Sequence, residues 1–532
     1  MKDAIIIGAG FAGLYMLHRL REVGMTAQVY EAGSDVGGTW YWNRYPGARC
    51  DVESLDYQFA FSDELQRGWT WTERYAPQAE ILDYLRYVAD RLELRDDIQL
   101  DTRVETATFD ETRNLWHLTT DQGDSVSAPV CISAVGCLSA ARVPDFPGLK
   151  DFQGTWYHTG HWPHEPVDFT GQRVGLIGTG SSGIQCIPEI AAEAKHLTVF
   201  QRTANFSVPA HNAKLSADMV EAYKDTFIAA RQAATQTDFG NSTWSSLPSA
   251  LALSPEERDA AYEQSWSVGG AQFMVAFEDM LTDKQANDTA ADFLRAKIHA
   301  IVKDPDVAEL LCPTDHPVGA KRLCVDTDYY ATFNRDNVQL VDVRSAPIEA
   351  ITATGLRTAD AEYEFDALVF ATGFDAMTGP LTRIDIRGRN GEKLSDKWAA
   401  GPRTYLGLAV AGFPNFFCIT GPGSPSVLSN MALSIEQHVE WIADCLVWLR
   451  EQGSATIEAA ASAEDTWVEH VNEIADATLF PQADSWYVGA NVPGKPRVFM
   501  PYVGGVRAYR NECDAVVAQD YASFVTDSAQ NT

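Results

Sequence analysis

The sequence is short of positive charge and contains no long apolar run. Lys and Arg number 41 against 73 Asp and Glu, which gives a formal net charge of −32. This excess of carboxylates argues against nucleic acids and anionic membranes as binding partners. No apolar segment approaches the about 20 residues that a membrane-spanning helix needs.

Paired cysteines are missing as well. The nine cysteines form no CxxC motif and show no paired spacing. Such a pattern is typical of free thiols in a reducing compartment, so we expect a cytoplasmic protein. The 532 residues exceed the size of one ordinary domain, and we expect two or three domains.

A glycine-rich turn follows the first apolar segment. Residues 4–7 are predicted to form a buried strand, and the turn Gly8, Gly10, Gly13 opens an amphipathic helix. These glycines permit a tight turn, close approach to a pyrophosphate and close packing of helix on strand. A second predicted strand ends at Glu31, where an acid accepts hydrogen bonds from ribose hydroxyls. The segment therefore predicts a dinucleotide site, which we assign to FAD.

The next segment, GGTWYWNRYPGARCD, narrows the chemistry of this site. It contains one cysteine, Cys50, without a partner at the right spacing, which argues against a redox dithiol. The aromatic residues around Trp40 offer a surface for a flat ring system. Packing in the hydrophobic core is the alternative role for these side chains.

A second glycine loop repeats the pattern. Gly178, Gly180 and Gly183 follow a predicted strand, and the next strand presents Arg202 and Thr203 where an acid would be expected. A guanidinium there suits the 2′-phosphate of NADP. Two nucleotide units predict a flavoprotein reduced by NADPH. The alternative is that one of the two loops is degenerate and empty.

We expect an α/β fold with two Rossmann-like dinucleotide-binding domains and a helical insertion in the NADP domain. The stretch between residues 210 and 317 shows helical patterns, including a capping box that starts at Ser254. The predicted parts are 1–137 and 372–532 for the FAD-binding domain, 138–209 and 318–371 for the NADP-binding domain, and 210–317 for the insertion. The tail beyond about Asp527 is expected to be frayed.

An unusual stretch, FQGTWYHTGHWP, lies between the two nucleotide units. Phe152, Gly154, His158 and Trp162 form the pattern F-x-G-x-x-x-H-x-x-x-W. A metal site is disfavoured because His158 and His161 have no visible third ligand, and a packed core strip is the other simple interpretation. The pattern resembles the fingerprint of type I Baeyer–Villiger monooxygenases.

This resemblance extends over essentially the whole chain. Stretches such as HWPHEPVDFTGQRVGLIGTGSSGIQ and SWYVGANVPGKPRVFM are similar to the family, and most similar to its phenylacetone-oxidising members. Related flavin-containing N- and S-oxygenases typically end the fingerprint in Tyr or Phe, and Trp162 points away from them. By analogy with the family, we expect His158 and Trp162 to act as a joint that positions the linker and the nicotinamide domain.

The resemblance implies FAD- and NADPH-dependent insertion of one oxygen atom of O2 beside a ketone carbonyl, by way of a flavin C4a-peroxide. The implied substrate is a small aromatic or cyclic ketone, and thioether sulfoxidation is implied as a side activity. The resemblance also implies that the protein is a monomer. An N- or S-hydroxylating flavin monooxygenase is the alternative enzyme class. A non-oxygenating NADPH oxidase and a purely structural or binding role are further alternatives.

The resemblance also implies the catalytic residues. Arg322 would be a fixed cation beside the reacting oxygen and the nicotinamide, and Asp51 would orient it. Lys321 would bind the 2′-phosphate together with Arg202, and Trp486 would lie on a mobile loop that closes over NADP. No metal is expected. A surface Lys-Arg pair and a core tryptophan are the alternatives.

Further positions match residues that contact cofactor and substrate in the family. The full set of expected cofactor contacts is Gly8, Gly10, Gly13, Glu31, Thr39, Trp40, Asp51, Tyr57, Val104, Met431, Gly178, Thr179, Gly180, Ser181, Ser182, Gly183, Gln185, Arg202, Thr203, Lys321 and Arg322. The expected substrate contacts are Ser426, Val427 and Leu428. Cys137 and Val427 differ from the phenylacetone-oxidising members, so the preferred ketone stays open.

Overall fold

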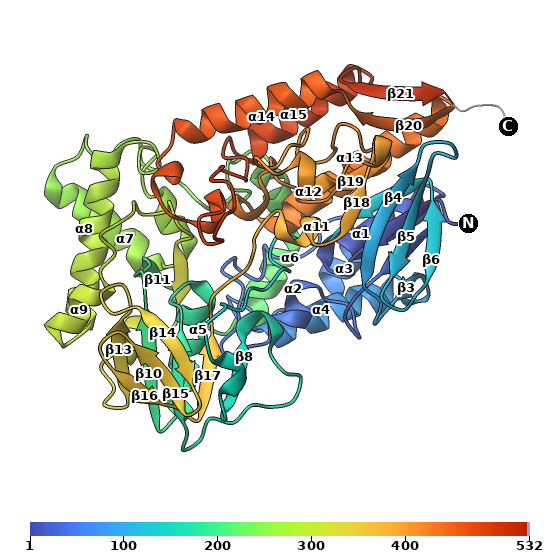
Figure 1. Cartoon of the computed structure of the whole chain (residues 1–532). Coiled ribbons are helices and arrows are strands. Elements are labelled where there is room, and N and C mark those ends of the chain that lie inside the picture. Colours follow the sequence, from blue (N-terminus) through green and yellow to red (C-terminus); the bar gives the residue numbers. More distant parts are fainter. Residues whose placement is uncertain (529–532) are drawn as a thin grey trace.

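The computed structural model describes residues 1–528 and contains two parallel five-stranded sheets (Figure 1). The first has the strand order β19-β7-β1-β2-β3, and each neighbouring pair is parallel. Its strands are β1 (Ala4–Ile7), β2 (Ala27–Tyr30), β3 (Ile98–Gln99), β7 (Val130–Ser133) and β19 (Phe416–Cys418). All four residues of β1 and of β7 are buried, as expected when layers cover both faces of a parallel sheet.

The second sheet has the order β13-β10-β9-β17-β8 and is parallel throughout. Its strands are β8 (Thr155–His158), β9 (Arg173–Ile177), β10 (His196–Gln201), β13 (Val338–Asp342) and β17 (Ala367–Phe370). Helix α5 (Ser181–Glu193) follows β9 and packs its buried face on this sheet. The predicted α/β fold with two Rossmann-like units is therefore confirmed.

Smaller sheets and further helices complete these two units. The additional strands are β4 (Val104–Asp110), β5 (Leu115–Thr120), β6 (Ser125–Ala128), β11 (Ser207–Pro209), β12 (Cys324–Asp326), β14 (Ile348–Thr352), β15 (Gly355–Thr358), β16 (Glu362–Glu364), β18 (Asp385–Arg387), β20 (Ser454–Ala459) and β21 (Phe524–Ser528). The helices outside the insertion are α1 (Phe11–Glu22), α2 (Thr39–Trp42), α3 (Asp63–Gly68), α4 (Gln78–Arg91), α10 (Tyr329–Thr332), α11 (Gly379–Thr382), α12 (Leu394–Lys397), α13 (Met431–Glu451), α14 (Ala461–Asp476) and α15 (Val506–Ala518).

The C-terminal segment returns to the first sheet. Helix α13 packs on α1 within the core that the first sheet shares, so chain segments more than 400 residues apart form one hydrophobic layer. Asp527 and Ser528 lie in β21, which pairs with β20. The rest of the tail predicted to be frayed lies outside the described residues.

The predicted insertion contains α6 (Ala217–Ala234), α7 (Pro255–Val268), α8 (Lys284–Ile301) and α9 (Pro305–Leu311). Helix α7 begins with the predicted capping box, in which Ser254 accepts from the Glu257 amide and Glu257 accepts from the Ser254 amide. Helices α7 to α9 lie at one end of the molecule in Figure 1.

Helix α6 contacts the first nucleotide unit instead. The buried Lys224 Nζ donates to the Arg67 carbonyl at 3.0 Å, and Arg231 Nε lies 3.5 Å from the Glu436 carboxylate. The insertion is thus held by both units, and our domain boundaries remain predictions.

The stretch with the fingerprint pattern forms β8 and the turn after it. His158 is buried, and its Nε2 lies 3.2 Å from the Arg142 carbonyl and 3.3 Å from Thr372 Oγ1. Arg142 precedes β8 and Thr372 follows β17. His158 therefore contacts both the segment that enters the second sheet at β8 and the segment that leaves it after β17. Trp162 is buried against Tyr157, with 5.1 Å between ring centroids. This position fits the predicted joint. No helix within residues 1–528 has the length and apolarity needed to cross a membrane.

Candidate active site and cofactor sites

The first glycine loop forms a tight turn at the start of α1. Gly8 has φ +106°, and a Cβ on Gly13 would lie only 1.8 Å from the Gly8 carbonyl oxygen. Within the described chain, no side chain caps the first turn after Gly10, so its amides are free for an anion. The buried Glu31 accepts from the Ala9 and Gly33 amides at 2.7 Å each, which fixes its carboxylate beside the loop. These residues fit a bound FAD.

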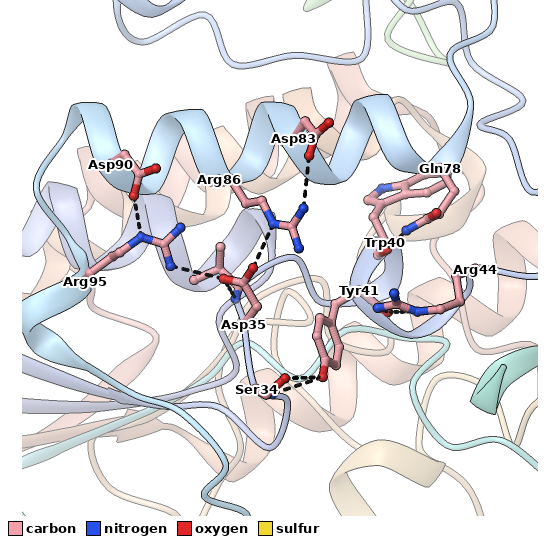
Figure 2. Close-up of polar contacts among 11 residues, drawn as sticks. Ser34, Asp35, Trp40, Tyr41, Arg44, Gln78, Asp83, Arg86, Asp90 and Arg95 are labelled. Atoms are coloured by element: carbon pink, nitrogen blue, oxygen red, sulfur yellow. Dashed lines mark hydrogen bonds and ion pairs between the residues drawn. The ribbon is translucent and has the colours of Figure 1, made fainter. Parts of the chain in front are cut away.

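A network of ion pairs holds the segment that follows Glu31, as Figure 2 shows. Asp35 binds Arg86 on α4 at 2.7 Å and Arg95 at 3.1 Å, and Tyr41 Oη accepts from the Ser34 amide at 3.1 Å. Burial by itself raises the pKa of Asp35, but the hydrogen bonds from the two guanidiniums bring it below the ordinary value. The loop that carries the glycine pair is therefore fixed to α4.

The residues expected along FAD lie in two places. Trp40 Nε1 donates to Tyr57 Oη at 3.2 Å, and Tyr57 packs on Phe11 at the start of α1. Met431 begins α13, directly after the helix cap Asn430. Thr39 is exposed at the start of α2, next to Trp40. Val104, by contrast, begins β4 in a core cluster with Ile7 and Tyr30, at the ends of β1 and β2.

The second glycine loop has the same geometry as the first. Gly178 has φ +110°, and a Cβ on Gly183 would lie 2.1 Å from the Gly178 carbonyl oxygen. A Cβ on Gly180 would meet no atom of the described chain within 4 Å, which leaves the approach that a pyrophosphate needs. Ser181 and Ser182 form the uncapped first turn of α5. The loop fits NADP.

Two residues tie this loop to its surroundings. Thr179 Oγ1 donates to the Thr203 carbonyl at 3.0 Å. The Gln185 amide accepts from Tyr45 Oη at 2.8 Å and donates to the Arg49 carbonyl at 3.1 Å, so it links α5 to the first nucleotide unit. Both polar atoms of Gln185 therefore contact protein.

Cations gather where β10 ends. Arg202 is exposed and Thr203 half-buried directly after that strand. Burial lowers the pKa of Lys321, and the charge of Arg202 lowers it further while that of Asp315 raises it. The positive charges of Lys321 and Arg202 therefore disfavour each other, and a bound anion such as a 2′-phosphate would relieve this repulsion.

The centre of the site is an ion pair between the two units. Arg322 Nε and Nη2 donate to the two carboxylate oxygens of Asp51 at 2.9 and 2.7 Å, and Nη1 donates to the Val427 carbonyl at 2.6 Å. Burial by itself lowers the pKa of Arg322, but the Asp51 carboxylate more than offsets this and holds the pKa above its ordinary value. Arg322 is a permanent, oriented cation.

A small cavity lies beside this ion pair. It is lined by Asp51, Val52, Phe239, Asn241, Trp244, Ala271, Met274, Arg322, Leu323, Leu428, Ser429, Asn430 and Tyr487. Of the expected substrate residues, Leu428 lines the cavity. Val427 meets Arg322 through its carbonyl, and the fully buried Ser426 has its Oγ 3.0 Å from Cys137 Sγ.

Trp486 lies one residue from this lining. Its ring packs on that of Tyr487, with centroids 4.2 Å apart, and against the cluster that contains Leu428 and Val427. Tyr487 itself was not predicted from the sequence, although it adjoins a residue that was. Phe239, Trp244 and Met274 were missed because no motif marks them in the predicted insertion.

Comparisons with known proteins show the family of this chain. The family model of pyridine nucleotide-disulphide oxidoreductases matches residues 5–239. A Baeyer–Villiger monooxygenase from Pseudooceanicola batsensis is 45% identical over 99% of this chain and 96% of its own length. The chain belongs to the Baeyer–Villiger monooxygenases. The nine cysteines of this Baeyer–Villiger monooxygenase are all buried and unpaired.

The descriptions of other similar proteins name cofactors and reactions. A solved structure described as oxidized steroid monooxygenase bound to NADP is 52% identical, with a TM-score of 0.95 and coverage of 99% of this chain and 100% of that one. A complex of OTEMO with FAD and NADP is 40% identical, with a TM-score of 0.95 and 99% coverage of both chains. A phenazine N-monooxygenase from Lysobacter antibioticus is 44% identical over 99% of this chain and 97% of its own length. The Baeyer–Villiger monooxygenase described here uses FAD and NADP.

Proposed function

We propose that this Baeyer–Villiger monooxygenase converts a ketone held in the cavity beside Arg322 into an ester or lactone. The observation that carries the proposal is the bidentate pair of Arg322 with Asp51 at the wall of a largely apolar cavity. FAD, when bound and reduced by NADPH, would supply from O2 the oxygen atom that enters beside the carbonyl carbon.

Arg322 supplies the fixed positive charge that this reaction needs. Its guanidinium stabilises negative charge that develops on oxygen, and it stays protonated while doing so. Asp51 occupies two of its N–H groups and the Val427 carbonyl a third, so the guanidinium cannot turn away from the cavity. Because the guanidinium is already positioned before the reaction, it needs little reorganisation during the reaction.

The cavity lining suggests how the ketone is oriented. Phe239, Trp244 and Met274 contribute apolar surface to the lining, and Asp51 and Arg322 contribute charged groups. We propose that the carbonyl faces Arg322 and that the apolar body of the substrate faces Trp244. Relatives named for acetone and for cyclohexanone indicate that the size of the ketone varies within the family.

N-oxygenation is the second candidate, because a relative of similar identity is named for it. An amine that is oxidised needs no fixed cation to stabilise a tetrahedral oxygen adduct, which favours the ketone reaction at a site built around Arg322. We also propose that the chain acts as a monomer in the cytoplasm, and the buried free cysteines support a reducing compartment.

The experiment is to compare wild type with Arg322→Ala and Arg322→Lys in two assays. Ester formation from a ketone should fall at least about 100-fold in Arg322→Ala, while anaerobic bleaching of bound FAD by NADPH continues. Arg322→Lys keeps the charge and should retain part of the ester yield. Loss of ester formation together with loss of FAD binding would contradict the proposed role, as would an unchanged yield.

A further inference from the structure

An additional ion pair lies at the end of the second sheet, next to the residues proposed to bind the 2′-phosphate. Strand β13 pairs in parallel with β10, and the Val343 amide donates to the Gln201 carbonyl at 2.9 Å. This register carries Arg344 to the side of Thr203, whose Oγ1 accepts from Arg344 Nη2 at 3.2 Å. The same guanidinium forms an ion pair with Asp315. Arg344 thus reaches the end of β10 where Arg202 lies.

Asp315 is held in this place by a second partner. Its Oδ1 lies 2.7 Å from Nδ1 of His316, and the buried His316 ring packs edge-on against Phe206. Burial by itself raises the pKa of Asp315, but the bonds to His316 and Arg344 and the charge of Lys321 bring the pKa down to about 2. A carboxylate that is ionised at neutral pH therefore lies within the group of cations.

This arrangement has a consequence for an incoming phosphate. Arg202, Lys321 and Arg344 supply three positive charges, and Asp315 removes one. A phosphate monoester carries a charge of about −1.5 to −2 near pH 7, and a guanidinium can bind it through two N–H groups. Arg344 is 54% exposed in its side chain, so it can turn from Asp315 to a ligand without leaving a buried group unpaired.

We propose that Arg344 is a third cation for the 2′-phosphate of NADP, and that Asp315 is a counter-charge that holds Arg344 and competes with the phosphate. The proposal rests on the assignment of the 2′-phosphate to Arg202 and Thr203. Removal of Arg344 then weakens binding of a 2′-phosphate, whereas removal of the Asp315 charge strengthens it.

The alternative is that the pair only ties the insertion to the second sheet. Asp315 belongs to the predicted insertion and Arg344 to the predicted NADP domain, so either substitution would break such a tie. A structural tie therefore predicts that both substitutions change binding in the same direction or not at all. The two interpretations differ in the direction in which Asp315→Asn changes the affinity for the 2′-phosphate.

The test is calorimetric titration of the full-length, FAD-loaded protein with adenosine 2′,5′-bisphosphate, which carries the 2′-phosphate but no nicotinamide. Arg344→Ala should raise Kd about ten-fold, and Asp315→Asn should lower it about three- to five-fold. Arg344→Lys should lie between wild type and Arg344→Ala. Binding of NAD, which lacks the 2′-phosphate, should change less than about two-fold in each variant.

A matched control lies on the neighbouring small sheet. Arg357 Nε and Glu349 Oε2 form an ion pair of 3.4 Å with side chains 50% and 54% exposed, and neither residue is among the predicted cofactor contacts. Arg357→Ala and Glu349→Gln should leave both affinities unchanged. Thermal unfolding of each variant checks that it is folded, and Arg344→Gln replaces Arg344→Ala if the latter is not.

Each remaining outcome decides a specific point. If Arg344→Ala and Asp315→Asn both weaken binding, the pair is a structural tie and the proposal is wrong. If Arg202→Ala weakens binding but Arg344→Ala does not, the 2′-phosphate assignment stands and the role of Arg344 falls. If neither arginine matters, the assignment to Arg202 is wrong, and the proposal falls with it.

Discussion

The substitution Gly180→Ala adds one methyl group, which should weaken cofactor binding without destabilising the fold. Gly180 caps α5 with φ −83° and ψ −172°, a conformation that alanine adopts without strain. Its added Cβ would meet no atom of the described chain within 4 Å. Since alanine restricts the unfolded chain, the free energy of unfolding should stay equal or rise by about 0.4–1 kcal/mol.

The same methyl lies where the pyrophosphate must approach the helix. Displacing the phosphates from the α5 amides weakens charge-assisted hydrogen bonds that contribute about 1.5–3 kcal/mol. The Kd for NADP should therefore rise about 10- to 100-fold. Titration of the FAD-loaded protein with NADP gives Kd, and urea unfolding gives the stability.

Gly183→Ala is the matched comparison on the same loop. Its Cβ would lie 2.1 Å from the Gly178 carbonyl oxygen, so this variant should lose stability as well as NADP binding. An unchanged Kd in Gly180→Ala would refute the assignment of this loop to the pyrophosphate. A large loss of stability in that variant would refute the reasoning from space and conformation.

Three further substitutions test other parts of the account. Asp51→Asn removes the charge that orients Arg322, so the rate of ester formation should fall about 10- to 100-fold in the FAD-saturated protein; an unchanged rate would contradict the role of the pair. Arg231→Ala leaves the buried Glu436 carboxylate without its cation, so the free energy of unfolding measured with urea should fall by about 3–5 kcal/mol. A fall below about 1 kcal/mol would mean that solvent replaces the ion pair. Burial lowers the pKa of His158 to about 4, below the unfolded value of 6.5, so its stabilising contribution is present above pH 6.5 and is lost as the pH falls through about 4. His158→Gln should therefore lose less stability than wild type between pH 6.5 and 4, and parallel pH profiles from urea unfolding would contradict this.

Local signals in the sequence were sufficient for the nucleotide units. The predicted strand at residues 4–7 coincides with β1, because a short buried apolar run next to a glycine turn has few alternatives. The capping box at Ser254 marks the start of α7 because its two hydrogen bonds are local. The start of helix α13 at Met431 is likewise set by a local cap, because the Asn430 side chain accepts from the Ala432 and Leu433 amides.

Other features depend on pairs that are distant in the sequence. Arg231 contacts Glu436 across 205 positions, and no local pattern indicates that α6 packs on the first nucleotide unit. The cavity residues Phe239, Trp244 and Met274 have no motif, and only the fold brings them beside Arg322. The pair of Asp51 with Arg322, predicted from the resemblance, lies within bidentate hydrogen-bond distance, while its catalytic role remains a proposal.

The central claim is that this chain inserts an oxygen atom of O2 beside a ketone carbonyl. The most direct measurement is mass spectrometry of the product formed from phenylacetone, NADPH and ¹⁸O2 by the purified, FAD-loaded protein. We expect benzyl acetate that carries one labelled oxygen, and a panel of cyclic ketones should give singly labelled lactones. NADPH oxidation that yields only hydrogen peroxide over the whole panel, while an amine or thioether is oxygenated, would contradict the claim.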